Sequence, residues 1–202
     1  MRMKRIGIYG GTFSPPHNGH VHAARNFFEK MQLDRLLIIP TYLPPHKQRT
    51  EQTSPEDRLS MCRLAFDFSD RIEISDIEIV RQGKSFTSDT LRALYEEDSR
   101  LYFLCGTDMF LTLESWHEPE VIFSLAAIVC VARENDPCVK RDIDRAAEEY
   151  RAKYNAEIHI LPCEAIDVSS SEIRALRAQN GEWEQQLPAH VAGYIRERSL
   201  YL

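Results

Sequence analysis

Residues 10–20 constrain the fold of this chain more than any other segment. An apolar run at 3–9 predicts a strand before them, and an amphipathic pattern predicts a helix that begins near Gly19. Gly10 and Gly11 carry no Cβ, so the turn between strand and helix can approach a ligand closely. The helix start points N–H groups and a positive dipole end into the same space, which favours phosphate. This order of elements predicts a nucleotide site.

Two histidines, His17 and His20, stand three residues apart at the mouth of this turn. Neutral and protonated imidazole both donate hydrogen bonds that a polyphosphate can accept. Gly-Gly and Pro-Pro dipeptides alone are ordinary turn signals, but the H-N-G-H order directly after a strand favours chemistry on phosphorus. The spacing is not the G-x-G-x-x-G fingerprint. It is not a P-loop either, because Glu78 stands where the first glycine before Gly83-Lys84-Ser85 would belong.

Strand and helix patterns alternate along the rest of the chain. This alternation predicts a single doubly wound, Rossmann-like α/β domain with a mostly parallel sheet, helices on both faces and a small helical C-terminal part. A length of 202 residues suits one such domain, spanning 1–202. The segment 72–80 alternates apolar and polar residues and predicts one bent strand or two short ones. The other predicted strands are 36–39, 101–105, 126–132 and 158–161, and the later helices are 55–65, 87–97, 139–154, 170–179 and 188–197.

Composition excludes several classes of protein. The 31 acidic residues outnumber the 25 basic ones, which argues against nonspecific nucleic-acid binding. The five cysteines form no C-x-x-C pair, so neither a zinc site nor a disulfide framework is indicated, and a cytoplasmic location is expected. No signal peptide and no apolar run of about 18 residues is present, so no membrane association is expected. The sequence leaves a homo-oligomer open.

The turn motif, read as G-G-T-F-x-P-x-H-x-G-H, resembles the signature of the nucleotidyltransferase superfamily and, within it, the bacterial nicotinate mononucleotide adenylyltransferases. The resemblance spans the chain and includes the segments 44–47, 85–91, 106–108 with 116–117, 168–174 and 187–202. It implies transfer of AMP from ATP to nicotinate mononucleotide. Mg²⁺ is expected as well, because paired polyphosphates need charge neutralisation; the ATP phosphates should supply most of its ligands, and no protein ligand is named. Nicotinamide mononucleotide or phosphopantetheine as acceptor stays open, as does a non-catalytic nucleotide-binding role.

The start of the helix near 169–174 is the second predicted phosphate site. Serines at 169–171 predict an N-cap, and Arg174 in the first turn opposes the helix dipole unless an anion lies over that end. The resemblance assigns the β- and γ-phosphates to this segment. The predicted catalytic residues are therefore His17, His20 and Arg174. The predicted ATP-binding residues are Gly10, Gly11, Thr12, Phe13, His17, Gly19, His20, Gly106, Asp108, Ser170, Ser171 and Arg174.

Acceptor-binding residues are predicted mainly from the resemblance. It implies Lys47, in a proline-rich loop at 40–54, for the mononucleotide phosphate. It also implies backbone N–H groups around Thr87 for the carboxylate and Trp116 for stacking on the pyridine ring. Arg133 ends a predicted strand and is expected to face the same cleft. A solvated loop lysine and a buried core tryptophan are the competing structural interpretations. Ser14 stands where many relatives carry aspartate, so no carboxylate role is inferred at that position.

Overall fold

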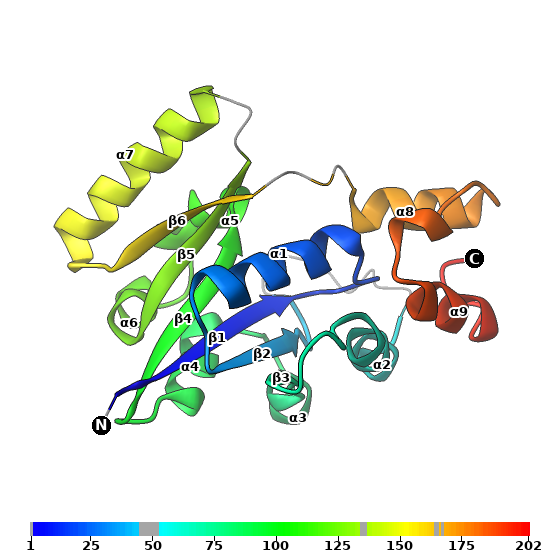
Figure 1. Ribbon diagram of the computed structural model, residues 1–202, viewed down its shortest axis with the longest axis horizontal. Helices are drawn as coiled ribbons and strands as arrows, with labels where there is room; N and C mark the ends of the chain where they lie inside the picture. The colour runs from blue at the N-terminus through cyan, green and yellow to red at the C-terminus, as the bar shows by residue number, and fades with distance from the viewer. Residues whose placement is uncertain (1, 45–52, 134–136, 164–165, 167) are drawn as a thin grey trace.

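The computed structural model describes residues 2–44, 53–133, 137–163, 166 and 168–202, with the side chains of Arg133 and Pro137 left outside that description. Its centre is a sheet of six strands in the order β3-β2-β1-β4-β5-β6 (Figure 1). Every pair of neighbouring strands is parallel. The strands are β1 (Lys4–Gly11), β2 (Arg35–Pro40), β3 (Ile72–Ile74), β4 (Ser99–Gly106), β5 (Ala126–Arg133) and β6 (Ile158–Cys163).

Helices cover both faces of this sheet, which confirms the predicted doubly wound α/β fold. They are α1 (Asn18–Lys30), α2 (Pro55–Ala65), α3 (Ile77–Arg81), α4 (Thr87–Leu94), α5 (Thr107–Phe110), α6 (Pro119–Leu125), α7 (Pro137–Tyr154), α8 (Ser170–Ala178) and α9 (Ala189–Glu197). Short 3₁₀ turns lie at Leu113–Ser115 and Glu184–Gln186. None of the helices in the described part of the chain combines the length and apolarity needed to cross a membrane.

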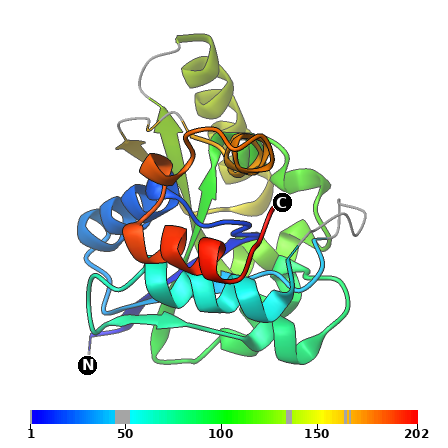
Figure 2. The same cartoon turned by 90° about the vertical axis from the view of Figure 1, so that its right-hand side faces the viewer.

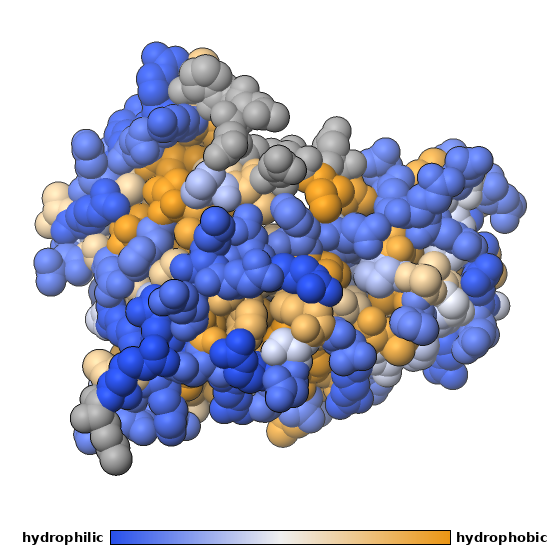
Figure 3. All heavy atoms as spheres, viewed as in Figure 1, coloured by the Kyte–Doolittle hydropathy of each residue, from blue (hydrophilic) through white to orange (hydrophobic). Residues whose placement is uncertain are grey.

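Two apolar cores lie on opposite faces of the sheet, because successive strand residues point to alternate sides. On β2, Leu36 and Ile38 belong to the core that α1, α2, α8 and α9 cover. Leu37 and Ile39 belong to the core that α4, α5, α6 and α7 cover. On the face seen in Figure 3, the surface over α1 is mostly polar. The central strands β2, β4 and β5 are thus buried on both faces, as in other parallel sheets, while the edge strand β3 carries the exposed Glu73.

The C-terminal helices return to the start of the fold. Helix α9 runs alongside α2 (Figure 2), and its Tyr194 hydroxyl donates a hydrogen bond of 2.8 Å to Asp57 on that helix. Ser54 caps α2 through the backbone N–H of Asp57, and Pro55 is its first residue, as the sequence predicts. This packing brings the end of the chain close to the carboxyl end of β1.

One predicted element is wrong in part. Only residues 72–74 of the segment 72–80 form a strand, and Ile77–Arg81 is a short helix. The ladder between β2 and β3 ends at Ile38 and Ile74, after which the N–H of Val80 bonds to the carbonyl of Asp76. The helical turn buries Glu78 and exposes Val80, so tertiary contacts override the alternating pattern.

Candidate active site

The glycine turn lies at the point where the strand order reverses between β1 and β4, the usual place for a ligand in such sheets. A Cβ on Gly11 would lie 2.9 Å from the Phe13 ring, so this position needs glycine. Phe13 itself has a left-handed φ of 50° and a buried side chain. Its ring packs edge-on against His20, with the ring centres 5.2 Å apart. The side chain of Phe13 therefore supports the turn from inside the core.

His17 and His20 form a reciprocal cap at the start of α1. The Nδ1 atom of His17 accepts a hydrogen bond of 3.3 Å from the backbone N–H of His20. The Nδ1 atom of His20 accepts one of 3.2 Å from the N–H of His17. Because both Nδ1 atoms are acceptors, each neutral ring carries its proton on Nε2. The cap thus fixes both rings as Nε2–H donors.

The electrostatics of the pair favour neutral rings. The two rings stack with their centres 3.7 Å apart, so two positive charges would repel strongly. Burial lowers the pKa of His17 to about 4. Burial, and then the neighbouring His17, lower the pKa of His20 well below its usual value. Both rings are neutral donors at neutral pH until a bound anion stabilises a charge on them.

These pKa values predict a stability change in acid. The unfolded chain binds a proton on His17 near pH 6.5, while the folded chain does so only near pH 4, so stability falls as the pH drops between these values. A His17→Asn variant keeps an N-cap acceptor but has no titrating ring. Between pH 7 and pH 5 the original protein should lose about 2 kcal/mol more of its free energy of unfolding than this variant. Urea unfolding at both pH values measures the difference, and equal losses would contradict the assignment.

The start of α8 meets the glycine turn from the other side. Ser169 is the N-cap, and its hydroxyl accepts from the N–H of Glu172. The Ser170 hydroxyl donates a hydrogen bond of 2.9 Å to the carbonyl of Pro15. Arg174 donates one of 2.7 Å to the carbonyl of Ser14 and one of 3.1 Å to the Ser171 hydroxyl. The two predicted phosphate segments are therefore in direct contact.

A second layer of polar side chains, which the sequence analysis missed, holds the turn from behind. The buried Ser14 hydroxyl lies 3.0 Å from the Thr53 hydroxyl and 3.1 Å from that of Tyr201. Arg58, only 1% exposed, donates to the carbonyls of Thr12 and Tyr42 at 2.9 and 3.3 Å. Ser14 is thus part of a neutral hydroxyl cluster, and the C-terminal segment belongs to the wall of the site.

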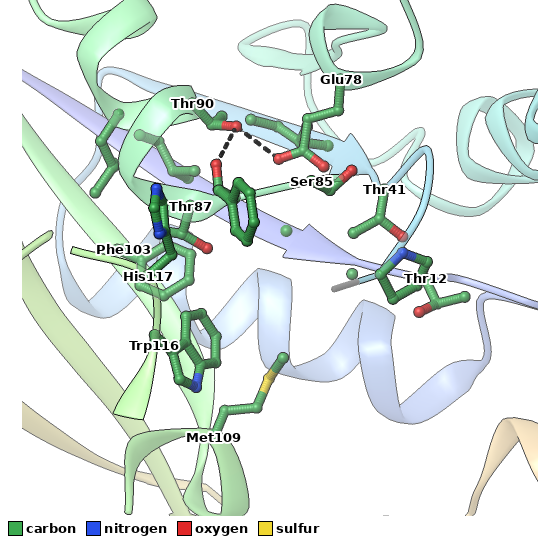
Figure 4. Close-up of a pocket in the computed structure, with 17 residues that line it drawn as sticks. Thr12, Thr41, Glu78, Ser85, Thr87, Thr90, Phe103, Met109, Trp116 and His117 are labelled. Carbon is green, nitrogen blue, oxygen red and sulfur yellow. Dashed lines mark hydrogen bonds between the residues drawn. The ribbon is translucent and has the colours of Figure 1, made fainter. Parts of the chain in front are cut away.

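A pocket of about 220 Å³ opens on the other side of the glycine turn (Figure 4). Its lining includes five predicted site residues, namely Gly10, Gly11, Thr12, Thr87 and Trp116. Trp116 is half-buried and packs edge-on against Phe103, with the ring centres 6.2 Å apart. The Trp116 side chain therefore both lines the pocket and packs against Phe103. Thr87 is the first residue of α4, whose start has no side-chain cap within the described residues.

The remaining predicted site residues either make none of the hydrogen bonds described above and do not line the pocket, or lie outside the described residues. Gly106 and Asp108 are exposed where β4 passes into α5, and neither lines this pocket. Gly19 lies in the first turn of α1, where a Cβ would approach Val168 to 3.0 Å. Lys47 and the side chain of Arg133 lie outside the described residues. Glu78, also missed from the sequence, lines the pocket with a buried carboxyl group.

The family model for cytidylyltransferase-like proteins matches residues 8–176, which include the capped histidine turn, so the chain is a nucleotidyltransferase. Within that class, the chain belongs to the nicotinate-nucleotide adenylyltransferase family. It is 36% identical to a probable nicotinate-nucleotide adenylyltransferase of Desulfatibacillum aliphaticivorans, over 98% of this chain and 100% of the relative. A relative with the same description from Shouchella clausii is 34% identical, over 98% and 97% of the two chains.

Solved structures agree on the fold. The Plasmodium falciparum nicotinic acid mononucleotide adenylyltransferase complexed with NaAD superposes with a TM-score of 0.76. The alignment covers 98% of this chain and 97% of that one at 18% sequence identity. The chain therefore has the α/β fold of this solved structure. The relatives named above identify it as a nucleotidyltransferase enzyme.

Proposed function

We propose that the protein transfers AMP from ATP to nicotinate mononucleotide, giving nicotinate adenine dinucleotide and pyrophosphate, a step of NAD biosynthesis. The observation that carries this proposal is the contact between the histidine-capped turn and the start of α8, beside a pocket that ends at Trp116. Hydrogen-bond donors from α1 and α8 lie on one side of the turn, and we assign the triphosphate to this side. An aromatic wall stands on the other side, where a pyridine ring fits.

The reaction needs no nucleophile from the protein. An oxygen of the acceptor phosphate forms a bond to the α-phosphorus of ATP while the bond from that phosphorus to the bridging oxygen breaks, and pyrophosphate leaves with the electron pair. The protein therefore has to place two polyanions in line and stabilise the charge that develops. We assign the Nε2–H groups of His17 and His20 and the guanidinium of Arg174 to the ATP phosphates, together with Ser170 and Ser171.

The acceptor is assigned to the pocket. We propose that its pyridine ring stacks on Trp116 and that its carboxylate accepts hydrogen bonds from the N–H groups at the start of α4, near Thr87. Lys47 remains a predicted contact for its phosphate, and Arg133 remains a predicted substrate-binding residue of the same cleft. Gly106 and Asp108 remain predicted contacts for the nucleoside of ATP.

Mg²⁺ is proposed to arrive on the ATP phosphates. Phosphate oxygens are expected to be its main ligands, because Mg²⁺ is rarely held by an all-protein cage. When bound, the ion neutralises charge on the polyphosphate. We also propose that residues 1–202 act as one domain in the cytoplasm.

A pyrophosphate-release assay tests the proposal. The purified protein is supplied with ATP, Mg²⁺ and one of three acceptors, which are nicotinate mononucleotide, nicotinamide mononucleotide and phosphopantetheine. We expect the highest kcat/KM with nicotinate mononucleotide. Turnover with phosphopantetheine alone would keep the ATP site but overturn the proposed acceptor. No turnover with any acceptor, while ATP still binds, would favour a nucleotide-binding role.

Trp116→Ala should weaken binding of the acceptor more than binding of ATP. Removal of the indole takes away one face of the pocket but leaves the histidine turn and the start of α8 intact. We expect KM for nicotinate mononucleotide to rise about 10-fold or more and KM for ATP to change less than about 3-fold. Steady-state kinetics with each substrate varied in turn measure both. Equal increases would show that Trp116 acts only through its packing on Phe103.

A further inference from the structure

One end of the acceptor pocket is polar, although most of its lining is apolar. Figure 4 shows Thr41, Ser85 and Glu78 grouped at this end, close to Thr12, with Trp116 at the opposite end. Thr41 follows β2, and its N–H donates a hydrogen bond of 2.9 Å to the carbonyl of Gly11. The polar end therefore lies next to the glycine turn.

Glu78 is the first unusual group at this end. Its side chain comes from α3 and belongs to a residue that is 5% exposed. The Thr90 hydroxyl donates a hydrogen bond of 2.7 Å to Oε1, and Arg81 lies 3.9 Å from the same oxygen. The second oxygen, Oε2, is buried and has no hydrogen-bond partner among the described residues. A buried carboxyl oxygen left without a partner is costly, so this one calls for an explanation.

Thr41 is the second unusual group. Its Oγ1 atom is also buried and also lacks a hydrogen-bond partner among the described residues. The neighbouring Ser85 hydroxyl accepts a hydrogen bond of 2.9 Å from the N–H of Tyr42, which leaves its own proton to interact with the Glu78 carboxyl group. Two unpartnered oxygens, one of them on a carboxyl group, thus line the same end of one pocket.

The chemistry of these two atoms limits what they can bind. A carboxylate oxygen accepts hydrogen bonds and repels anions, so a phosphate or a second carboxylate does not suit Oε2. A threonine hydroxyl both donates and accepts. Hydroxyl groups of a sugar satisfy both atoms, because each hydroxyl is a donor and an acceptor.

The position in the pocket agrees with a sugar. A mononucleotide consists of a ring, a ribose and a phosphate in that order. With the ring at Trp116 and the phosphate at the glycine turn, the ribose falls beside Thr41 and Glu78. We propose that Glu78 Oε2 and Thr41 Oγ1 bind the 2′- and 3′-hydroxyl groups of the acceptor ribose and make the enzyme selective for ribose over deoxyribose. This inference rests on the proposed function.

The alternative is a bracing role, in which Glu78 only joins α3 to α4 through Thr90. Acceptor analogues separate the two roles. The assay compares nicotinate mononucleotide with its 2′-deoxy and 3′-deoxy forms, using the original protein and the variants Glu78→Gln and Thr41→Val. In Glu78→Gln, the amide oxygen can still accept from Thr90, but an NH₂ group that only donates replaces Oε2. The matched control is Glu73→Gln, because Glu73 is an exposed residue on β3.

We expect the original protein and Glu73→Gln to use at least one deoxy acceptor about 10-fold or more less efficiently, in kcat/KM, than the ribose acceptor. In Glu78→Gln and in Thr41→Val, kcat/KM for the ribose acceptor should fall about 10-fold. For the analogue that lacks the hydroxyl group bound by the replaced side chain, kcat/KM should change little. Thr41→Ser, which keeps the hydroxyl, should retain the preference. Heat denaturation of each variant checks that it folds.

Three outcomes decide the matter. Equal use of all acceptors by the original protein would overturn the ribose site, and this result needs no variant. Equal losses with every acceptor in Glu78→Gln and Thr41→Val would overturn it in favour of bracing. No turnover of nicotinate mononucleotide by the original protein would instead overturn the proposed function.

Discussion

His20→Asn is expected to lower kcat/KM for AMP transfer by about 100- to 1,000-fold while leaving the protein folded. Removal of one preorganised donor to a developing charge typically costs a factor of this size. The asparagine carbonyl can still occupy the place of Nδ1 and accept from the N–H of His17, so the cap of α1 survives. Nothing in that side chain reaches the place of Nε2. The variant therefore separates the capping role of His20 from its donor role.

His20→Gln and His190→Ala complete the test. The glutamine amide reaches farther and can donate from near the position of Nε2, so we expect this variant to retain more activity than His20→Asn. His190 is exposed on α9, and its replacement should leave kcat/KM within about 2-fold. Pyrophosphate release and thermal unfolding are measured for all three. Turnover near the original level in His20→Asn would remove His20 from the mechanism.

The sequence predicts the fold well because the central strands are strongly apolar and buried on both faces. The run at 126–132 and the run at 101–105 both form central strands of the sheet. The segment 72–80 fails because its apolar and polar residues alternate through a strand and a helix. In the folded chain the helix Ile77–Arg81 buries Glu78 against Thr90, a contact 12 residues away in the sequence that the local pattern does not reveal.

The sequence predicts which segments form the site, but it does not predict the hydrogen bonds between them. The motif locates His17 and His20 at a helix start, yet histidine is not among the usual capping residues. The spacing of an N-cap residue and a partner three positions later is the same as in a Ser-x-x-Glu capping box, and this signal would have predicted the reciprocal bonds. Tyr201 gave no comparable signal. It lies 187 residues from Ser14 in the sequence, so only the folded chain reveals their contact.

Arg174 shows how an inference from the sequence changes when the contacts are known. The sequence argument needs a bound anion to explain a cation at the start of a helix. The structure gives Arg174 a partner within the protein, since its guanidinium donates to the carbonyl of Ser14. A guanidinium carries five N–H donors, so this bond and the one to Ser171 leave donors for a phosphate. The residue can therefore both hold the turn against α8 and bind the triphosphate.

Arg174→Ala is accordingly expected to lower kcat/KM for ATP by about 100-fold or more, because it removes a charge-assisted donor from the phosphate site. Arg174→Lys restores the charge but not the forked geometry, and we expect an intermediate loss. Arg196→Ala, an exposed arginine on α9, is the control and should leave kcat/KM within about 2-fold.

Salt separates the two roles of Arg174. If its charge binds the triphosphate, added salt should raise KM for ATP more steeply in the original protein than in Arg174→Ala, because screening removes an attraction that the variant already lacks. If Arg174 only holds the turn, the two salt dependences should be parallel and the variant should chiefly lose thermal stability. Suppose that the salt dependence of KM for ATP is parallel in both proteins and that kcat/KM of Arg174→Ala is near normal. The histidines alone would then bind the triphosphate, and α8 would only support the turn.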